Sequence, residues 1–206
     1  SFTKKGQLKK LPNTFGGYSI KIFDNPELLD MEIQKRAKES DSALSRVIAT
    51  YDWEYSSTRK PMVQDHLVKY WEVLIGKWHK PWNRELESEL TRKEKRDIKG
   101  LAWAEQPKTI NEVGSTFTIQ GFDLNYAGVI LGPSVKYRDG KIIFDPSASH
   151  NEKAVRNRTL SDGTKKKFGE TLIQHEVRVL MTRGVNGMYI YACDPELRAA
   201  LLAAAK

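Results

Sequence analysis

The chain has almost no cysteine and no long apolar segment. Cys193 is the single cysteine among 206 residues, so no disulfide can form within the chain, as is typical of proteins from a reducing compartment. No apolar run approaches the roughly 20 residues that a membrane-spanning helix requires. Residues 1–10 are basic and polar and lack the apolar stretch of a secretory signal peptide. These absences predict a cytoplasmic protein without membrane contact.

Several catalytic and metal-binding patterns are missing too. The chain has no Gly-x-x-x-x-Gly-Lys-Ser/Thr loop, and Gly76-Lys77-Trp78 lacks both the leading glycine and the hydroxyl of that pattern. It has no Gly-x-Ser-x-Gly sequence, and its four histidines and Cys193 show no metal-ligand spacing. We therefore expect no metal site and no complete site for nucleotide hydrolysis within this chain.

Positive charge is in excess. The chain carries 34 Lys and Arg against 26 Asp and Glu, a formal net charge of +8. A basic balance favours polyanionic partners, because each neutralised phosphate releases counterions. Many soluble proteins are equally basic, so charge alone raises the expectation of a nucleic-acid partner only modestly.

Strand and helix patterns alternate from the beginning of the chain. Tyr18–Phe23 has the β-rich alternation of a strand, Asn25-Pro26 begins a helix that runs to about Lys38, and Ser45–Thr50 forms a short buried strand. This order begins a parallel α/β unit. Tyr51–Glu54 follows the second strand, so its side chains should lie at the carboxyl edge of the sheet, where α/β proteins bind ligands.

The second half of the chain resumes this alternation. Its expected elements are a strand or strand end at Thr116–Ile119, a buried strand at Tyr126–Leu131, a hairpin of Val135–Tyr137 with Lys141–Phe144, a helix at Phe168–Met181, a strand at Met188–Ala192 and a final helix capped by Asp194-Pro195-Glu196. A mobile, polar loop is expected at residues 145–167. The fold class is thus α/β with a mostly parallel sheet.

Two other regions depart from this alternation. We expect residues 1–17 to form a flexible basic lead-in and residues 18–206 to form one domain with an insertion at about 54–106. The insertion has a charged helical stretch, Arg84 to Lys99. The stretch from Tyr51 to Gln106 contains all five tryptophans of the chain: Trp53, Trp71, Trp78, Trp82 and Trp103.

Two motifs about sixty residues apart carry the most information. The first is Ser115-Thr116-Phe117-Thr118-Ile119-Gln120-Gly121-Phe122-Asp123, and the second is Val179-Leu180-Met181-Thr182-Arg183-Gly184. With Trp103-Ala104, Asn111–Gly114 and Tyr126–Gly132, they resemble the bacterial Schlafen group 3-like DNA/RNA helicase family and the late motifs of the second lobe of a superfamily 1 helicase. The resemblance runs from about Tyr18 to Asp194 and implies a RecA-like lobe.

The resemblance implies that the chain is the C-terminal motor lobe of an ATP-dependent DNA or RNA helicase or translocase. ATP and Mg²⁺ would be held mainly by an N-terminal RecA-like lobe, which this sequence does not contain. Arg183 would act as an arginine finger on the γ-phosphate, because its fixed fork of donors suits developing phosphoryl charge. Alternatively, Arg183 stabilises the last carbonyls of its helix. Gln120, Gly121, Asp123 and Thr182 are the accompanying nucleotide-binding candidates.

The same motif offers nucleic-acid contacts. The hydroxyls of Ser115, Thr116 and Thr118 can donate to phosphate oxygens, although threonine is also simply a strand former. Two departures from the family pattern stand out: Phe117 occupies the usual histidine position, and Phe122-Asp123 replaces Leu-Glu.

Further nucleic-acid candidates lie outside the two motifs. Trp78 and Trp82 flank Lys80, which suits base stacking beside a phosphate contact, although tryptophans as often anchor a loop. Lys165 and Lys166 are candidate phosphate contacts, whereas the mixed charges of residues 92–99 are typical of a solvated helix face. A non-catalytic nucleic-acid or protein interaction module that keeps the RecA-like lobe is the alternative function.

Overall fold

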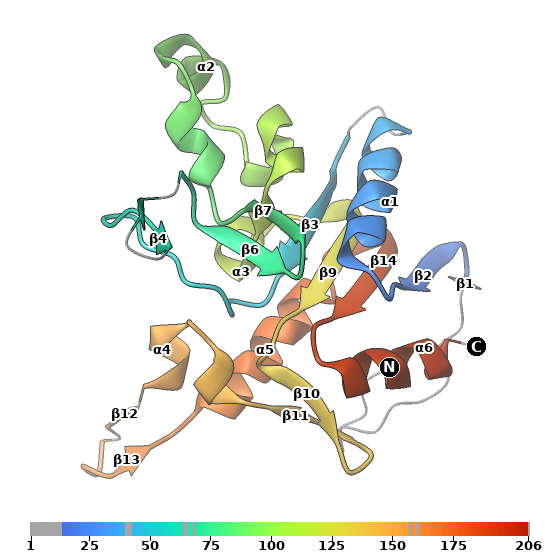
Figure 1. Ribbon diagram of the computed structural model, residues 1–206, viewed down its shortest axis with the longest axis vertical. Coiled ribbons are helices and arrows are strands. Elements are labelled where there is room, and N and C mark those ends of the chain that lie inside the picture. Colours follow the sequence, from blue (N-terminus) through green and yellow to red (C-terminus); the bar gives the residue numbers. More distant parts are fainter. Residues whose placement is uncertain are drawn as a thin grey trace.

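A six-stranded sheet forms the centre of the computed structural model, which describes residues 14–39, 43–63, 66–67, 69–156, 158–159 and 161–205 (Figure 1). Its strand order is β1-β2-β14-β9-β3-β8. The strands are β1 (Thr14–Phe15), β2 (Tyr18–Ile22), β3 (Ser45–Ala49), β8 (Val113–Gly114), β9 (Leu124–Leu131) and β14 (Gly184–Ala192). All run parallel except β1, which pairs antiparallel with β2. The predicted α/β class is confirmed, and the sheet is consistent with a RecA-like fold.

The helices begin where capping side chains predict. Asn25 accepts a hydrogen bond from the amide of Glu27 at 2.8 Å and begins α1 (Pro26–Lys38). Asp194 accepts one from the amide of Leu197 at 3.1 Å and begins α6 (Pro195–Ala204). In both helices a proline follows the cap, where its missing N–H costs nothing. The predicted helix near residues 168–181 is α5 (Gly169–Leu180).

The remaining elements are short. The helical ones are η1 (Glu85–Glu89), α2 (Arg92–Asp97), η2 (Trp103–Glu105), η3 (Pro107–Asn111), α3 (Thr116–Ile119), η4 (Pro146–Ala148) and α4 (Glu152–Val155). The small hairpins are β4 (Met62–Val63) with β5 (His66–Leu67), β6 (Glu72–Ile75) with β7 (Trp78–Pro81), β10 (Val135–Arg138) with β11 (Lys141–Phe144), and β12 (Arg158–Thr159) with β13 (Lys165–Lys166). The predicted Asp139-Gly140 turn is present, with positive φ at both residues.

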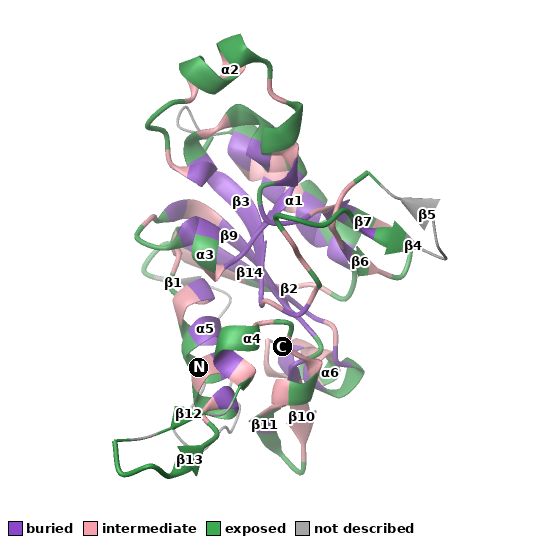
Figure 2. Cartoon of the chain, turned by 90° about the vertical axis from the view of Figure 1, so that its left-hand side faces the viewer, coloured by how far each residue is buried: buried purple, intermediate pink, exposed green. Residues whose placement is uncertain are grey.

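Separate hydrophobic cores cover the two faces of the sheet, whose central strands are buried (Figure 2). On one face, α5 and α6 contribute Ile173, Val177, Leu180, Leu197 and Leu201. On the other face, α1 contributes Leu29 and Ile33, and the inserted segment contributes Val73 and Trp82. A parallel sheet needs cover on both faces, so the inserted segment is part of the domain core.

The inserted segment contains more regular secondary structure than the sequence predicts, and a buried ion pair attaches it to α1. The ammonium of Lys80 on β7 lies 2.6 Å from Asp30 Oδ1 on α1, and both side chains are about nine-tenths buried. Lys80 also donates to the carbonyl of Ile110 at 3.0 Å. The expected helical stretch from Arg84 to Lys99 is divided into η1 and α2.

Two other sequence predictions are wrong. Thr116–Ile119 is a short helix and not a strand, because Ser115 and Thr118 cap each other: the Ser115 amide donates to Thr118 Oγ1 at 2.8 Å. This local capping overrides the β-propensity of the sequence. Residues 145–167 are not simply a loop, since they contain η4, α4 and the β12–β13 hairpin. Most of the predicted flexible lead-in, residues 1–13, lies outside the described residues.

We expect Gly128→Ala to destabilise the fold, because α1 lies directly on this glycine. A β-carbon there would stand 2.7 Å from Ile33 Cγ1 and 2.8 Å from Leu29 Cδ2. Overpacking of this kind costs about 1–3 kcal/mol in free energy of unfolding, measurable by urea titration. Met31→Ala, at an exposed position of the same helix, serves as the control. A stabilised Gly128→Ala protein, as chain entropy alone would give, would contradict this packing.

Candidate functional site

The ends of the two sequence motifs meet at the amino edge of the sheet. β9 begins directly after Asp123, and β14 begins directly after Arg183. The amide of Leu124 donates to the carbonyl of Arg183 at 2.8 Å, which joins the starts of these parallel strands. The two motifs, about sixty residues apart in sequence, therefore form one surface.

Arg183 is held at this surface by several acceptors. Its Nε donates to the carbonyl of Val179 at 3.0 Å and its Nη1 to that of Phe122 at 3.4 Å. Nη1 also lies 3.2 Å from Asp123 Oδ1, an ion pair in which the arginine side chain is 20% exposed and the aspartate 63%. The contact with the end of its own helix, expected under the alternative interpretation, is thus present. The guanidinium nevertheless reaches the surface beside Asp123.

The other nucleotide-binding candidates lie close to this pair in the sequence. Gly121 adopts a φ of +76°, a left-handed conformation that favours glycine, and turns the chain from α3 toward β9. Gln120 immediately precedes it, is exposed, and lines a cavity together with Thr116 and Phe117. Thr182 Oγ1 accepts from Arg183 Nη2 at 3.2 Å and donates to the carbonyl of Val179 at 3.0 Å. Thr182 and Asp123 therefore both help to orient the guanidinium.

Three nucleic-acid candidates have buried side chains with internal roles. The Ser115 hydroxyl donates to Asn83 Oδ1 at 2.8 Å, and the Thr118 hydroxyl donates to the carbonyl of Ser115 at 2.9 Å. Trp82 is completely buried in the core beside α1. Thr116 differs, because its half-buried side chain lines a cavity.

The remaining nucleic-acid candidates have different surroundings. Trp78 is half-buried, and its Nε1 donates to Asp30 Oδ2 at 3.4 Å, next to the buried Lys80. Lys165 and Lys166 are exposed on the β12–β13 hairpin, where Lys166 Nζ lies 5.4 Å from the centroid of the Phe168 ring. Trp78 thus has a structural partner, whereas the two lysines face solvent.

A cleft beside the carboxyl ends of the strands was only partly foreseen from the sequence. It comprises adjoining hollows of about 610 Å³ and 300 Å³ that share Phe117, Asn151 and Lys153. The larger hollow is lined by residues that include Tyr51, Tyr55, Arg59, Phe117, His150 and Lys153. β3 and β9 are neighbours in the sheet. The next strand of this sheet after β3 in the chain, β8, lies on one side of this pair, and the next after β9, β14, lies on the other side. The Tyr51 turn therefore lies at a topological switch point, the usual ligand position of α/β sheets.

A buried carboxyl group, Glu176, supports the wall of this cleft. Its Oε1 accepts from the Tyr51 amide at 2.7 Å and from the Thr116 hydroxyl at 3.5 Å. Burial, with a smaller contribution from the nearby Asp52 carboxylate, raises the pKa of Glu176 to about 7. This carboxyl group therefore connects α5 to the turn after β3 and to α3.

Asp52 joins the carboxyl ends of β3 and β9 in a similar way. Its Oδ2 accepts from the Thr50 hydroxyl and from the Ser134 amide, each at 2.9 Å. Burial raises the pKa of Asp52 as well. Among the described residues, no cluster of three or more His, Cys, Asp or Glu side chains could hold a metal ion. In the same part of the chain, no helix is long and apolar enough to cross a membrane.

Sequence reasoning located this edge through Tyr51 and Asp52 but missed Arg59, Lys153 and Glu176. Arg59 is a single cation in an irregular segment and Lys153 a single cation on the four-residue α4, and no periodic pattern marks either of them. Glu176 had a signal: it lies among Ile173, Val177 and Leu180 on the buried side of α5. A carboxyl group on an apolar helix stripe needs a buried partner.

The raised pKa of Glu176 predicts a pH-dependent stability. The ordinary pKa of a glutamate is 4.5. Between pH 4.5 and about pH 7, Glu176 therefore holds a proton in the folded state that it has released in the unfolded state. The free energy of unfolding should therefore fall as pH rises through this window, by up to about 3 kcal/mol. Glu176→Gln should remove this component, so the difference in stability between variant and wild type grows toward pH 8 in urea titrations. Glu170→Gln, at an exposed position of α5, is the control. Parallel pH profiles for wild type and Glu176→Gln would refute the assignment.

Comparison with known proteins identifies the family. Residues 1–194 match the family described as "Schlafen group 3, DNA/RNA helicase domain". The chain is 32% identical over 213 residues to the "Uncharacterized protein YPL245W" of Saccharomyces cerevisiae, a match that covers 100% of this chain and 41% of the yeast protein. No solved structure matches the chain at a significant level. The chain belongs to the Schlafen group 3 DNA/RNA helicase domain family.

Proposed function

We propose that the chain is a motor lobe of an ATP-dependent DNA or RNA helicase or translocase. Membership in a helicase domain family supports a helicase-related role for the chain. The observation that carries the finer proposal is the position of Arg183: the second motif presents this guanidinium at a sheet edge, directly against Asp123 of the first motif.

The geometry of Arg183 suits an arginine finger. Its ion pair with the largely exposed Asp123 contributes at most about 1 kcal/mol, so an incoming phosphate could displace the carboxylate at little cost. The contacts with the carbonyls of Val179 and Phe122 keep the side chain oriented meanwhile. A preoriented guanidinium stabilises charge on a transferring phosphoryl group without further reorganisation.

The proposal requires a second RecA-like lobe. The sequence contains no phosphate-binding loop, so ATP and Mg²⁺ would be held mainly by an N-terminal lobe, with Gln120, Gly121, Asp123 and Thr182 completing the site. The chain spans only 41% of the yeast relative. Family membership favours DNA or RNA as the other partner.

The test is ATP hydrolysis by the full-length natural protein, with and without nucleic acid. We expect Arg183→Ala to lower kcat by about a hundredfold or more, as for other arginine fingers, while ATP binding is largely retained. Arg178→Ala, at an exposed position of the same helix, is the matched control and should leave turnover unchanged. Turnover that is insensitive to Arg183, or a full-length protein without a phosphate-binding loop, would exclude the motor role.

A non-catalytic interaction module is the second candidate. The specific observations in its favour are Phe117 at the usual histidine position, which removes an imidazole, and the missing phosphate loop. Such a module would bind nucleic acid or protein with equal affinity in the presence and absence of ATP. A motor lobe would instead change its nucleic-acid affinity as the ATP site closes.

A further inference from the structure

We propose that single-stranded nucleic acid binds in the cleft at the carboxyl edge, with a base stacked on Phe117 and phosphates on Arg59 and Lys153. This inference deepens the proposed function and rests on it for the class of ligand. It assigns strand binding to Phe117, at a position where the first motif departs from the family pattern, and to Arg59 and Lys153, which lie outside both motifs. In Figure 1 the inserted segment with β4 lies above α4 and the β12–β13 hairpin.

Phe117 has the features of a stacking platform. Its side chain is 53% exposed, although phenylalanine is commonly buried, and it lines both adjoining hollows. Its ring meets the Tyr51 ring edge-on, with centroids 5.3 Å apart, and Tyr51 in turn lies 5.4 Å from the buried Trp82. This aromatic support fixes the ring while leaving it open to the cleft. Base stacking uses such rings without regard to base identity.

Buried polar contacts hold the stacking platform in place. Glu176 accepts from the Tyr51 amide and the Thr116 hydroxyl, the neighbours of the Phe117 ring in space and in sequence. Asn83 accepts from the Ser115 hydroxyl and donates to the Tyr51 hydroxyl at 3.4 Å. The aromatic pair is therefore preorganised, which reduces the entropy lost when a base stacks on it.

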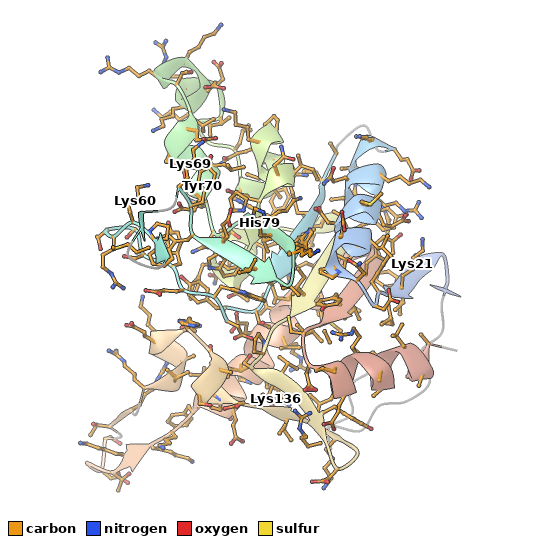
Figure 3. The ribbon with its side chains drawn as sticks, in the orientation of Figure 1. Lys21, Lys60, Lys69, Tyr70, His79 and Lys136 are labelled. Atoms are coloured by element: carbon orange, nitrogen blue, oxygen red, sulfur yellow. The ribbon has the colours of Figure 1, made fainter. Side chains whose placement is uncertain are left out.

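Cations reach the cleft from both sides. Arg59 lies on the inserted segment, followed by the exposed Lys60 (Figure 3), and Lys153 lies on α4. Within the described residues, Lys153 has no carboxylate within 4 Å, and Arg59 has only the exposed Glu54, at 3.2 Å. Glu152 is the opposing charge on the lining of the larger hollow, and Glu176 on that of the smaller one. By contrast, Lys69 is paired with Glu89.

The extent of the positive surface favours a strand over a mononucleotide. A third hollow of about 520 Å³ adjoins the first two at Lys153 and Arg158, and its lining also includes Arg156. Within the part of the chain that the structure describes, Arg156 and Arg158 have no carboxylate partner within 4 Å. Successive phosphates of one strand can bind along this row of cations while one of its bases stacks on the Phe117 ring.

The test is binding of the full-length protein to a fluorescein-labelled oligothymidylate of roughly 15 nucleotides, followed by anisotropy. Phe117→Leu, which keeps apolar bulk but removes the π-face, should weaken binding about tenfold, and Phe117→Trp should retain binding and show fluorescence quenching. Lys153→Ala should weaken binding and lower the salt slope by about 0.7 between roughly 50 and 200 mM salt. Matched controls are Met31→Ala and Lys95→Ala, at exposed positions of α1 and α2.

The outcomes separate this inference from the motor proposal. Phe117→Leu should not change the affinity for a blunt duplex, because its bases are already stacked, and excess AMP should compete only weakly. Strand affinity that is unchanged in Phe117→Leu and Lys153→Ala, with hydrolysis still dependent on Arg183, would overturn the cleft inference alone. Loss of strand binding in those variants, with Arg183→Ala inactive in hydrolysis but still bound to the strand, would support both. Absence of binding to any oligonucleotide, or full competition by AMP, would also overturn the cleft inference.

Discussion

The need to cover both faces of a parallel sheet underlies the rest of this structure. The central strands β3, β9 and β14 are buried, and α5 and α6 cover one face of them. On the other face α1 lies close over Gly128, but it leaves space that Val73 and Trp82 of the inserted segment fill. The insertion is therefore required by the core, because a parallel sheet with one open face would expose a large apolar surface.

Covering the sheet in this way also brings buried polar groups together, and these groups shape the cleft. The Lys80–Asp30 pair attaches the insertion to α1, and the Asn83–Ser115 contact attaches it to the start of α3. Glu176 then connects α5 to Tyr51 and Thr116. Each of these groups is costly to bury without a partner, so each contact fixes the position of the element that carries it. The walls of the cleft are thus positioned by the same contacts that complete the core.

The two candidate sites occupy different edges of the sheet. Arg183 and Asp123 lie where β14 and β9 begin, while Tyr51 and Phe117 lie beside the ends of β3 and β8. The short α3 crosses between these edges, since it follows β8 and leads through Gly121 into β9. One nine-residue motif therefore contributes Phe117 to one site and Asp123 to the other. In the motor that we propose, an ATP-driven change at the amino edge would therefore have a direct covalent connection to the cleft at the carboxyl edge.

The sequence by itself determined the α/β class, the capped starts of α1 and α6, the Asp139-Gly140 hairpin and the family resemblance. These features depend on local capping, turn geometry and hydrophobic period, which act between neighbours in the chain. Tertiary structure decided that Thr116–Ile119 is helical, that Ser115, Thr118 and Trp82 are buried, and that Arg59 and Lys153 face one cleft. It also placed Arg183 against Asp123, 60 residues apart in sequence. These outcomes depend on contacts between residues distant in sequence, which no local pattern encodes.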